Sequence, residues 1–189
     1  MSKLLEEHDF ETAAFQIDCD IASIKAVAEV ESAGAGFFSD GRTKILFEGH
    51  IFYKYTNGEF KDKHPDICYR TWTKKYYLGG VEEYSRLEKA ERLNKTAARL
   101  SASYGKFQIM GFNFALCGFT SVDEFYDAMQ TDEGAHLLAF TEYVKHVGLD
   151  NVLRSHKWTE FAKRYNGPEY WKNVYDTKLA AAYKKYSKQ

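Results

Sequence analysis

The sequence has few residues that interrupt or cross-link a chain. Among 189 residues there are only 2 Pro and 3 Cys. The cysteines, Cys19, Cys68 and Cys117, are odd in number and lack the spacing of metal ligands, so we expect neither a disulfide framework nor a zinc site. They suit a chain kept in a reducing compartment. Cys117 lies beside an apolar run and is expected in the core rather than as a nucleophile.

Long apolar runs and a net charge of one sign are also missing. No stretch approaches about 18 apolar residues, so no transmembrane segment is expected, and the N-terminus lacks the apolar region of a signal peptide. The net charge of −1 and the pI near 6.6 give no reason to expect a nucleic-acid partner. No His-Glu-x-x-His motif is present, which argues against a zinc amidase or peptidase. We expect no metal and no cofactor.

What the sequence does contain is an ordinary globular composition rich in aromatic residues. It is 44% hydrophobic and 28% charged, and its length suits one domain, here taken as residues 1–189. Aromatic residues make up 16%, with 14 Tyr and 14 Phe. Such side chains can stack on carbohydrate, although most of them are expected in the core.

The spacing of apolar residues predicts a mainly α-helical fold (α+β) with one small β element. Helices are expected at residues 9–16, 20–32, 82–100, 132–147, 158–165 and 169–186, with a further helix opened by the capping box at residues 121–124. The best strand candidate is residues 43–52. Residues 53–80 read as irregular, and residues 101–105 as a loop.

Glu31 is the most informative residue because of its place on the helix at 20–32. A rotation of about 100° per residue puts Glu31 on the apolar arc of that helix, whereas Glu29 points about 160° away, toward solvent. A carboxyl group on an apolar face loses water, which raises its pKa and suits it to act as a general acid. The alternative is that Glu31 only marks the end of the helix, because Gly34 follows closely.

Glu48 is the second carboxylate of interest. It lies in the predicted strand, where alternation places it on one face with Leu46 and His50. Glycoside hydrolysis uses one carboxylic acid to protonate the leaving oxygen and one carboxylate to activate water or stabilise the sugar cation. With 27 acidic residues in the chain, such a pair is a weak signal without further context.

Three segments supply that context, because they resemble motifs of lysozyme-like glycosidases and lytic transglycosylases. Residues 28–32 (AEVES) resemble the end of their catalytic helix, where a Glu-Ser pair carries the acid. Residues 103–110 (SYGKFQIM) resemble their Ser-x-Gly-x-x-Gln segment, which lines the glycan groove. Residues 164–168 (RYNGP) resemble their Tyr-Asn-Ala-Gly loop. The three motifs occur in the expected order.

From about residue 10 to 186 the chain is more closely similar to the N-acetylmuramidase family of phage and prophage endolysins. The similarity rests on residues 26–32, 40–42, 45–48 and 102–113. It implies a lysozyme-like fold, with a small β element beside the catalytic helix, and a muramidase with Glu31 as the acid and Glu48 as the second carboxylate. Two positions depart from the family pattern: Tyr104 stands where Trp is usual, and Gly49 where a bulkier polar residue is usual.

We expect five residues to shape the groove for the glycan strand: Arg42, Tyr104, Gln108, Tyr165 and Asn166. The two amides could hydrogen-bond acetamido or hydroxyl groups, and the two tyrosines could stack on sugars. Each also has a structural alternative, since an amide can satisfy the local backbone and a ring can simply pack.

The resulting hypothesis is hydrolysis of the β-1,4 bond between N-acetylmuramic acid and N-acetylglucosamine. The resemblance implies peptidoglycan glycan strands as the partner and a monomer. It also implies synthesis in the host bacterial cytoplasm and release through a separate pore-forming protein to act in the periplasm on the cell wall. Two alternatives remain: a lytic transglycosylase that uses Glu31 alone, and a non-catalytic glycan-binding virion module.

Overall fold

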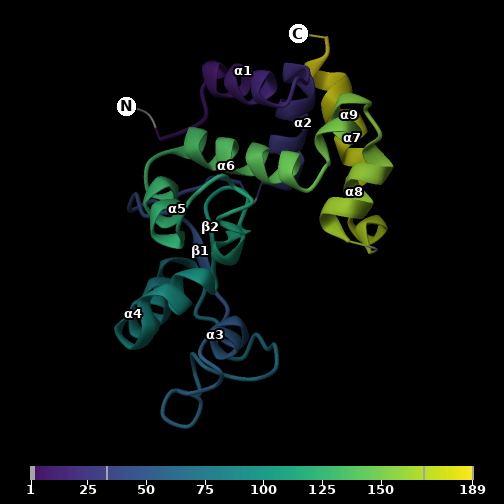
Figure 1. Ribbon diagram of the computed structural model, residues 1–189. Helices are drawn as coiled ribbons and strands as arrows, with labels where there is room; N and C mark the ends of the chain where they lie inside the picture. The colour runs from purple at the N-terminus through teal and green to yellow at the C-terminus, as the bar shows by residue number, and fades with distance from the viewer. Residues whose placement is uncertain (1–2, 33, 168, 189) are drawn as a thin grey trace.

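The computed structural model describes residues 3–32, 34–167 and 169–188 (Figure 1). Most of these residues are helical and a small sheet accompanies them, which confirms the expected fold class. The α-helices are α1 (Glu7–Gln16), α2 (Ile21–Glu31), α3 (Gly49–Tyr55), α4 (Glu83–Leu100), α5 (Val122–Met129), α6 (Glu133–His146), α7 (Asp150–Arg154), α8 (Trp158–Asn166) and α9 (Tyr175–Tyr186). Short 3-10 helices are η1 (Gly80–Glu82), η2 (Gly111–Asn113) and η3 (Tyr170–Asn173).

The sheet has three short antiparallel strands in the order β1 (Ile45–Phe47), β2 (Ala102–Tyr104) and β3 (Ile109–Met110). Ile45 pairs with Tyr104 and Phe47 with Ala102. In Figure 1 the sheet lies between an upper group of helices, which includes α1, α2, α6 and α9, and a lower group formed by α3, α4 and the loops that follow α3. Helix α9 packs along α2, and α6 packs on α1.

Helix α2 forms as its sequence pattern predicts. The side chain of Asp20 caps its N-terminus by accepting a hydrogen bond from the backbone N–H of Ser23 at 2.8 Å. Ile24, Val27 and Ala28 on its apolar arc are at most 4% exposed. The packing of these side chains fixes the rotation of the helix and therefore the side on which its last residue, Glu31, projects.

The strand predicted at residues 43–52 is wrong in its second half. Strand β1 ends at Phe47, and α3 begins at Gly49. A Cβ atom at Gly49 would lie 2.8 Å from the carbonyl oxygen of Ile67 and 2.3 Å from the ring of Tyr69. This close approach accounts for glycine at position 49, where the family resemblance led us to expect a bulkier residue.

Other boundaries also differ from the sequence expectation. Residues 102–104, expected as a loop, form β2, and α7 was not anticipated. The helix predicted at 169–186 is divided, because Val174 takes a left-handed backbone conformation with φ 50° between η3 and α9. Pro168 of the RYNGP segment lies outside the described residues. Within the part of the chain that is described, no helix has the length and apolar character to span a bilayer.

Candidate active site

Glu31 ends α2 and is half-buried. Burial raises the pKa of its carboxyl group from 4.5 to about 7, and a hydrogen bond from Asn166 opposes part of that rise. A carboxyl group with this pKa keeps its proton through most of the mildly acidic range. The site therefore provides a proton donor that works near neutral pH.

Asn166 reaches Glu31 from the end of α8, a distant part of the sequence. Its Nδ2 atom donates a hydrogen bond of 2.9 Å to Oε1 of Glu31. The amide thus meets the carboxyl group instead of satisfying the local backbone. An amide donor here orients the acid and stabilises the carboxylate that remains after the proton is transferred.

Glu29 faces away from Glu31, as the helical pattern predicts. Its Oε2 atom lies 2.6 Å from Nζ of Lys185 and accepts a hydrogen bond of 2.6 Å from the hydroxyl of Tyr186, and these contacts lower its pKa. Lys25, on the same side of the helix, pairs with Glu7 instead of Glu29.

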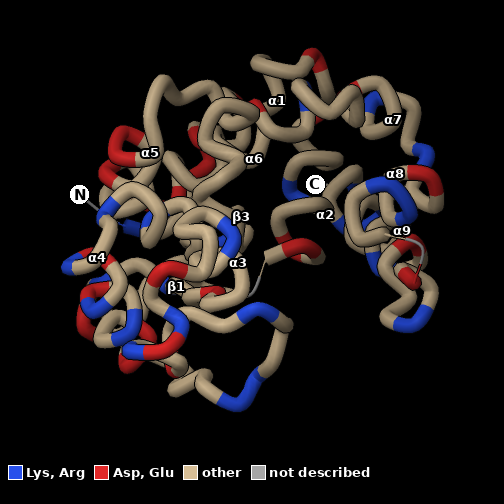
Figure 2. The backbone as a smooth tube through the Cα atoms, turned by 60° about the horizontal axis from the view of Figure 1, so that its bottom comes forward, with Lys and Arg blue, Asp and Glu red and all other residues tan. Residues whose placement is uncertain are grey.

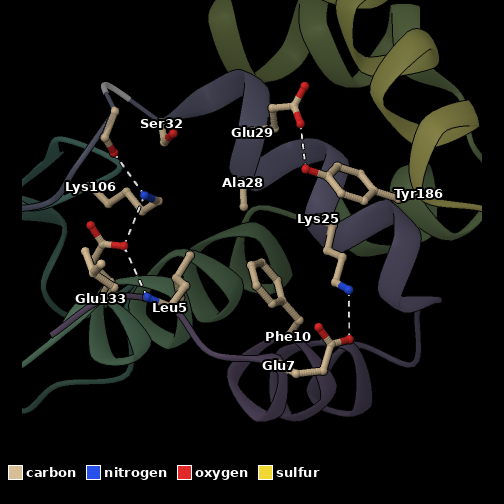
Figure 3. Close-up of a pocket in the computed structure, with 12 residues that line it drawn as sticks. Leu5, Glu7, Phe10, Lys25, Ala28, Glu29, Ser32, Lys106, Glu133 and Tyr186 are labelled. Atoms are coloured by element: carbon tan, nitrogen blue, oxygen red, sulfur yellow. Dashed lines mark hydrogen bonds and ion pairs between the residues drawn. The ribbon is translucent and has the colours of Figure 1, made fainter. Parts of the chain in front are cut away.

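Figure 3 shows Glu7, Lys25, Glu29 and Tyr186 around a pocket of about 560 Å³ on this side of α2. Its carboxylates are occupied by ion pairs or hydrogen bonds: Glu7 with Lys25, Glu29 with Tyr186, and the buried Glu133 with Lys106. Glu31 does not line this pocket. With its acids satisfied in this way, the pocket offers no carboxyl group poised for proton transfer.

Glu48 precedes α3, and both of its carboxylate oxygens have a near neighbour. The hydroxyl of Tyr77 donates a hydrogen bond of 2.7 Å to Oε1. Oε2 lies 3.2 Å from Nδ1 of His50, and neither of these two buried atoms has a hydrogen-bond partner among the described residues. The Glu48 side chain is 14% exposed and does not cap α3. The hydrogen bond that orients its carboxylate therefore comes from Tyr77, not from the helix.

Sequence reasoning missed Tyr77. It correctly placed His50 near Glu48, but for the wrong reason. Tyr77 comes from the irregular segment 53–80, where no periodicity singles out a residue. His50 was placed beside Glu48 by strand alternation, whereas in the structure it belongs to the first turn of α3. Nearness in sequence was the usable signal for His50.

A buried carboxylate, Glu83, holds the backbone next to Tyr77 in place. It is 1% exposed. Its Oε1 accepts hydrogen bonds from the backbone N–H groups of Leu78 and Gly79, and its Oε2 from the N–H of Phe47 and from Nη1 of Arg86 at 2.8 Å. Because all of its acceptor sites are directed at fixed donors, Glu83 is structural. It joins the loop that carries Tyr77 to strand β1.

Gln108 and Tyr165 come together as expected, and both line a pocket of about 210 Å³. The amide of Gln108, however, is already occupied. Oε1 accepts a hydrogen bond from Ser103, and Nε2 donates to the carbonyl groups of Gly105 and Lys44. The structural alternative is therefore correct for this side chain, which fixes the turn between β2 and β3.

The aromatic candidates belong mostly to the core. Tyr104 is 1% exposed, and its hydroxyl donates a hydrogen bond to the carbonyl of Arg99. Its ring has no face open to a sugar, which corrects the expectation of stacking there. Tyr165 is half-buried and stacks on Phe161, with ring centroids 5.5 Å apart.

Arg42 lies on an exposed turn. Its Nη2 atom pairs with Asp40 at 2.8 Å, and its guanidinium lies 4.8 Å from the ring centroid of Tyr84. The contacts of its guanidinium are thus to its own turn and to α4.

Cys117 lies in the core, as the sequence predicts. Cys117 is 3% exposed, and burial raises the pKa of its thiol to about 12, which keeps it protonated and unreactive. The expectation of a core position is confirmed. In the described parts of the chain, His, Cys, Asp and Glu side chains form no group of three that could hold a metal ion.

Comparison with known proteins gives a consistent result. The model of the N-acetylmuramidase family matches residues 20–187. The structure is similar to the crystal structure of an endolysin from Burkholderia AP3 phage, with a TM-score of 0.94 and 38% sequence identity, over 100% of this chain and 74% of that chain. A search of curated proteins found no match. We conclude that the chain belongs to the N-acetylmuramidase family and is a glycoside hydrolase that degrades peptidoglycan.

Proposed function

We propose that Glu31 is the general acid that cleaves the β-1,4 bond between N-acetylmuramic acid and N-acetylglucosamine. The observation that carries this proposal is the pKa of about 7 that burial gives Glu31 at the end of α2. In the reaction, Glu31 donates its proton to the glycosidic oxygen as the bond to the muramic acid C1 breaks. The amide of Asn166 then stabilises the carboxylate that is left.

In this mechanism Glu48 is the second carboxylate, acting as the base for water or as the electrostatic partner of the sugar cation. The hydrogen bond from Tyr77 supports the role because it orients the carboxylate before substrate arrives, which favours catalysis. The other oxygen lies 3.2 Å from His50 and has no hydrogen-bond partner among the described residues, so it is available to water. Gln108 and Tyr165 contribute the wall of the groove through the pocket that they line.

The competing reaction is that of a lytic transglycosylase, which closes the muramyl 6-hydroxyl onto C1. That reaction needs no second carboxylate. Burying a carboxylate such as Glu48 costs desolvation free energy. A role in hydrolysis gives a reason for that cost, whereas the transglycosylase reaction gives none.

The similarity to a phage endolysin supports a role in host lysis. We propose that the enzyme acts as a monomer, is made in the bacterial cytoplasm and reaches the periplasm through a pore formed by another protein.

The proposed reaction is tested by mass spectrometry of muropeptides released from purified sacculi. Hydrolysis leaves a reducing muramic acid end, which borohydride converts to muramitol. A transglycosylase leaves a 1,6-anhydro end, which borohydride does not reduce. A digest dominated by anhydro products would reject Glu48 as the base and leave Glu31 as the acid.

A further inference from the structure

A second groove begins beside Glu48 and runs along α3. It has a volume of about 550 Å³ and is lined by His50, Ile51, Tyr53, Lys54, Asn57 and Arg70. We call it the α3 groove. Its lining comes from α3, from Asn57 just after the end of that helix, and from Arg70. At about 550 Å³ the groove is large enough to accept a chain substituent rather than a single ion.

The lining of the α3 groove is positively charged. Lys54 and Arg70 are both exposed, and neither forms an ion pair within the described residues. No Asp or Glu is among the lining residues. The segment that follows Arg70, residues 71–79, adds Lys74 and Lys75 and contains no acidic residue. Figure 2 shows Lys and Arg colouring on the loop below α3. Cations left without carboxylates create a local field that attracts anions.

The groove is connected to the candidate active site through His50. That residue lines the groove and also lies 3.2 Å from Oε2 of Glu48. A glycan strand that presents its cleaved bond to Glu48 therefore passes the end of the groove. Substituents on the muramic acid next to that bond are the parts of the substrate that can enter it.

The walls of the groove are held in a fixed relation. The backbone N–H of Tyr69 donates to the carbonyl of Gly49 at 3.3 Å, which ties the residue before Arg70 to the first turn of α3. Nη2 of Arg86 donates to the carbonyl of Asp66 at 3.2 Å. The backbone that carries Arg70 is thus anchored opposite α3. A ligand that binds Arg70 does not have to order this loop first.

We infer that the α3 groove binds the carboxylates of the peptidoglycan stem peptide, with Lys54 and Arg70 as the cationic contacts. The stem peptide is attached to muramic acid through its lactyl group and carries several carboxylates. It is therefore both near the cleaved bond and of opposite charge to the groove. This inference rests on the proposed role of Glu48 only for the position of the cleaved bond. It makes the enzyme selective for peptide-bearing glycan.

The test compares intact sacculi with the same glycan strands after an amidase has removed their stem peptides. The variant is the double substitution Lys54→Gln and Arg70→Gln. Exposed ion pairs contribute modestly, so we expect the KM for intact sacculi to rise about fivefold with kcat nearly unchanged. On stripped glycan the variant and the wild type should perform alike, and added salt should reduce the difference on intact sacculi.

The matched control is Lys61→Gln with Lys63→Gln, two exposed cations of the same segment that do not line the groove. The control should stay within about twofold of the wild type on both substrates. An unchanged KM for the groove variant on intact sacculi, or an equal loss on both substrates, overturns the inference. So does a loss confined to binding of phosphatidylglycerol vesicles, which would assign the groove to a membrane surface.

Sedimentation with sacculi separates this inference from the proposed function. If the wild type releases no reducing muramic acid ends, the hydrolytic mechanism fails, but the comparison of bound protein on intact and stripped sacculi still decides the role of the groove. Weaker binding of the groove variant to intact sacculi alone supports the inference, and equal binding rejects it.

Discussion

Replacing Glu31 by Gln should abolish lysis and, at the same time, stabilise the protein at alkaline pH. Gln keeps the shape of the side chain and can still accept the hydrogen bond from Asn166, but it carries no proton to donate. Loss of a general acid typically lowers turnover by about 10²–10⁴-fold. The gain in stability follows because the wild-type carboxyl group must ionise while partly buried.

The magnitude follows from the two pKa values of Glu31, about 7 in the folded protein and 4.5 as its ordinary value. Between these values the folded state binds more protons than the unfolded state, so the wild-type free energy of unfolding falls as the pH rises through this window. At about 1.36 kcal/mol per pH unit, the loss is about 3 kcal/mol and is complete above pH 7. Gln does not titrate, so the variant avoids this loss of stability.

The assay is thermal unfolding of both proteins from pH 4 to pH 9. The difference in melting temperature should widen between pH 4.5 and 7, by about 6–12 °C for a domain of this size. Glu29→Gln is the control and should show the opposite sign. Glu29 is stabilised as a carboxylate by Lys185 and Tyr186, so its removal should slightly lower stability above its pKa and leave lysis intact. A difference in melting temperature that does not change with pH for Glu31→Gln would refute the argument that burial raises the pKa of Glu31.

Four further outcomes are expected. Glu48→Gln should lower turnover by orders of magnitude while sacculi still bind; near-normal turnover in the folded variant would move the base to another carboxylate. Tyr77→Phe removes the hydrogen bond to Glu48 and should lower kcat about tenfold with little change in KM, whereas a change in KM alone would indicate that Tyr77 contacts substrate. Asn166→Ala removes the donor that lowers the pKa of Glu31, so the alkaline limb of the profile should move to higher pH; movement to lower pH would contradict the assigned contact. Chelators and thiol reductants should leave lysis unchanged, and strong inhibition by a chelator without unfolding would reopen a metal-dependent mechanism.

The part of the site that could be predicted from sequence is the part that depends on local periodicity. The direction of Glu31 follows from the apolar arc of α2 and from the Asp20 cap, both of which act over a few residues. The opposite direction of Glu29 follows from the same helix. These features needed no knowledge of distant segments.

The environment of Glu48 could not be predicted in the same way. Its contact with Tyr77 joins residues 29 positions apart through an irregular loop, which has no repeating pattern to indicate where each side chain points. The close approach of Gly49 to the carbonyl oxygen of Ile67, at the start of α3, is also invisible from local sequence. The motif that contains Tyr104 likewise did not show whether its ring lies in the core or on the surface.

The buried pair of Glu83 and Arg86 limits how this protein can be redesigned. Replacing either residue alone leaves an uncompensated buried charge, which typically costs about 3–5 kcal/mol out of a total stability of about 5–15 kcal/mol. Exchanging both for apolar residues does not solve the problem here, because Glu83 also accepts backbone hydrogen bonds from Phe47, Leu78 and Gly79. Libraries that aim to change cleavage specificity can therefore vary the exposed positions 71, 72, 74 and 75, whereas positions 83 and 86 should be kept as a fixed pair.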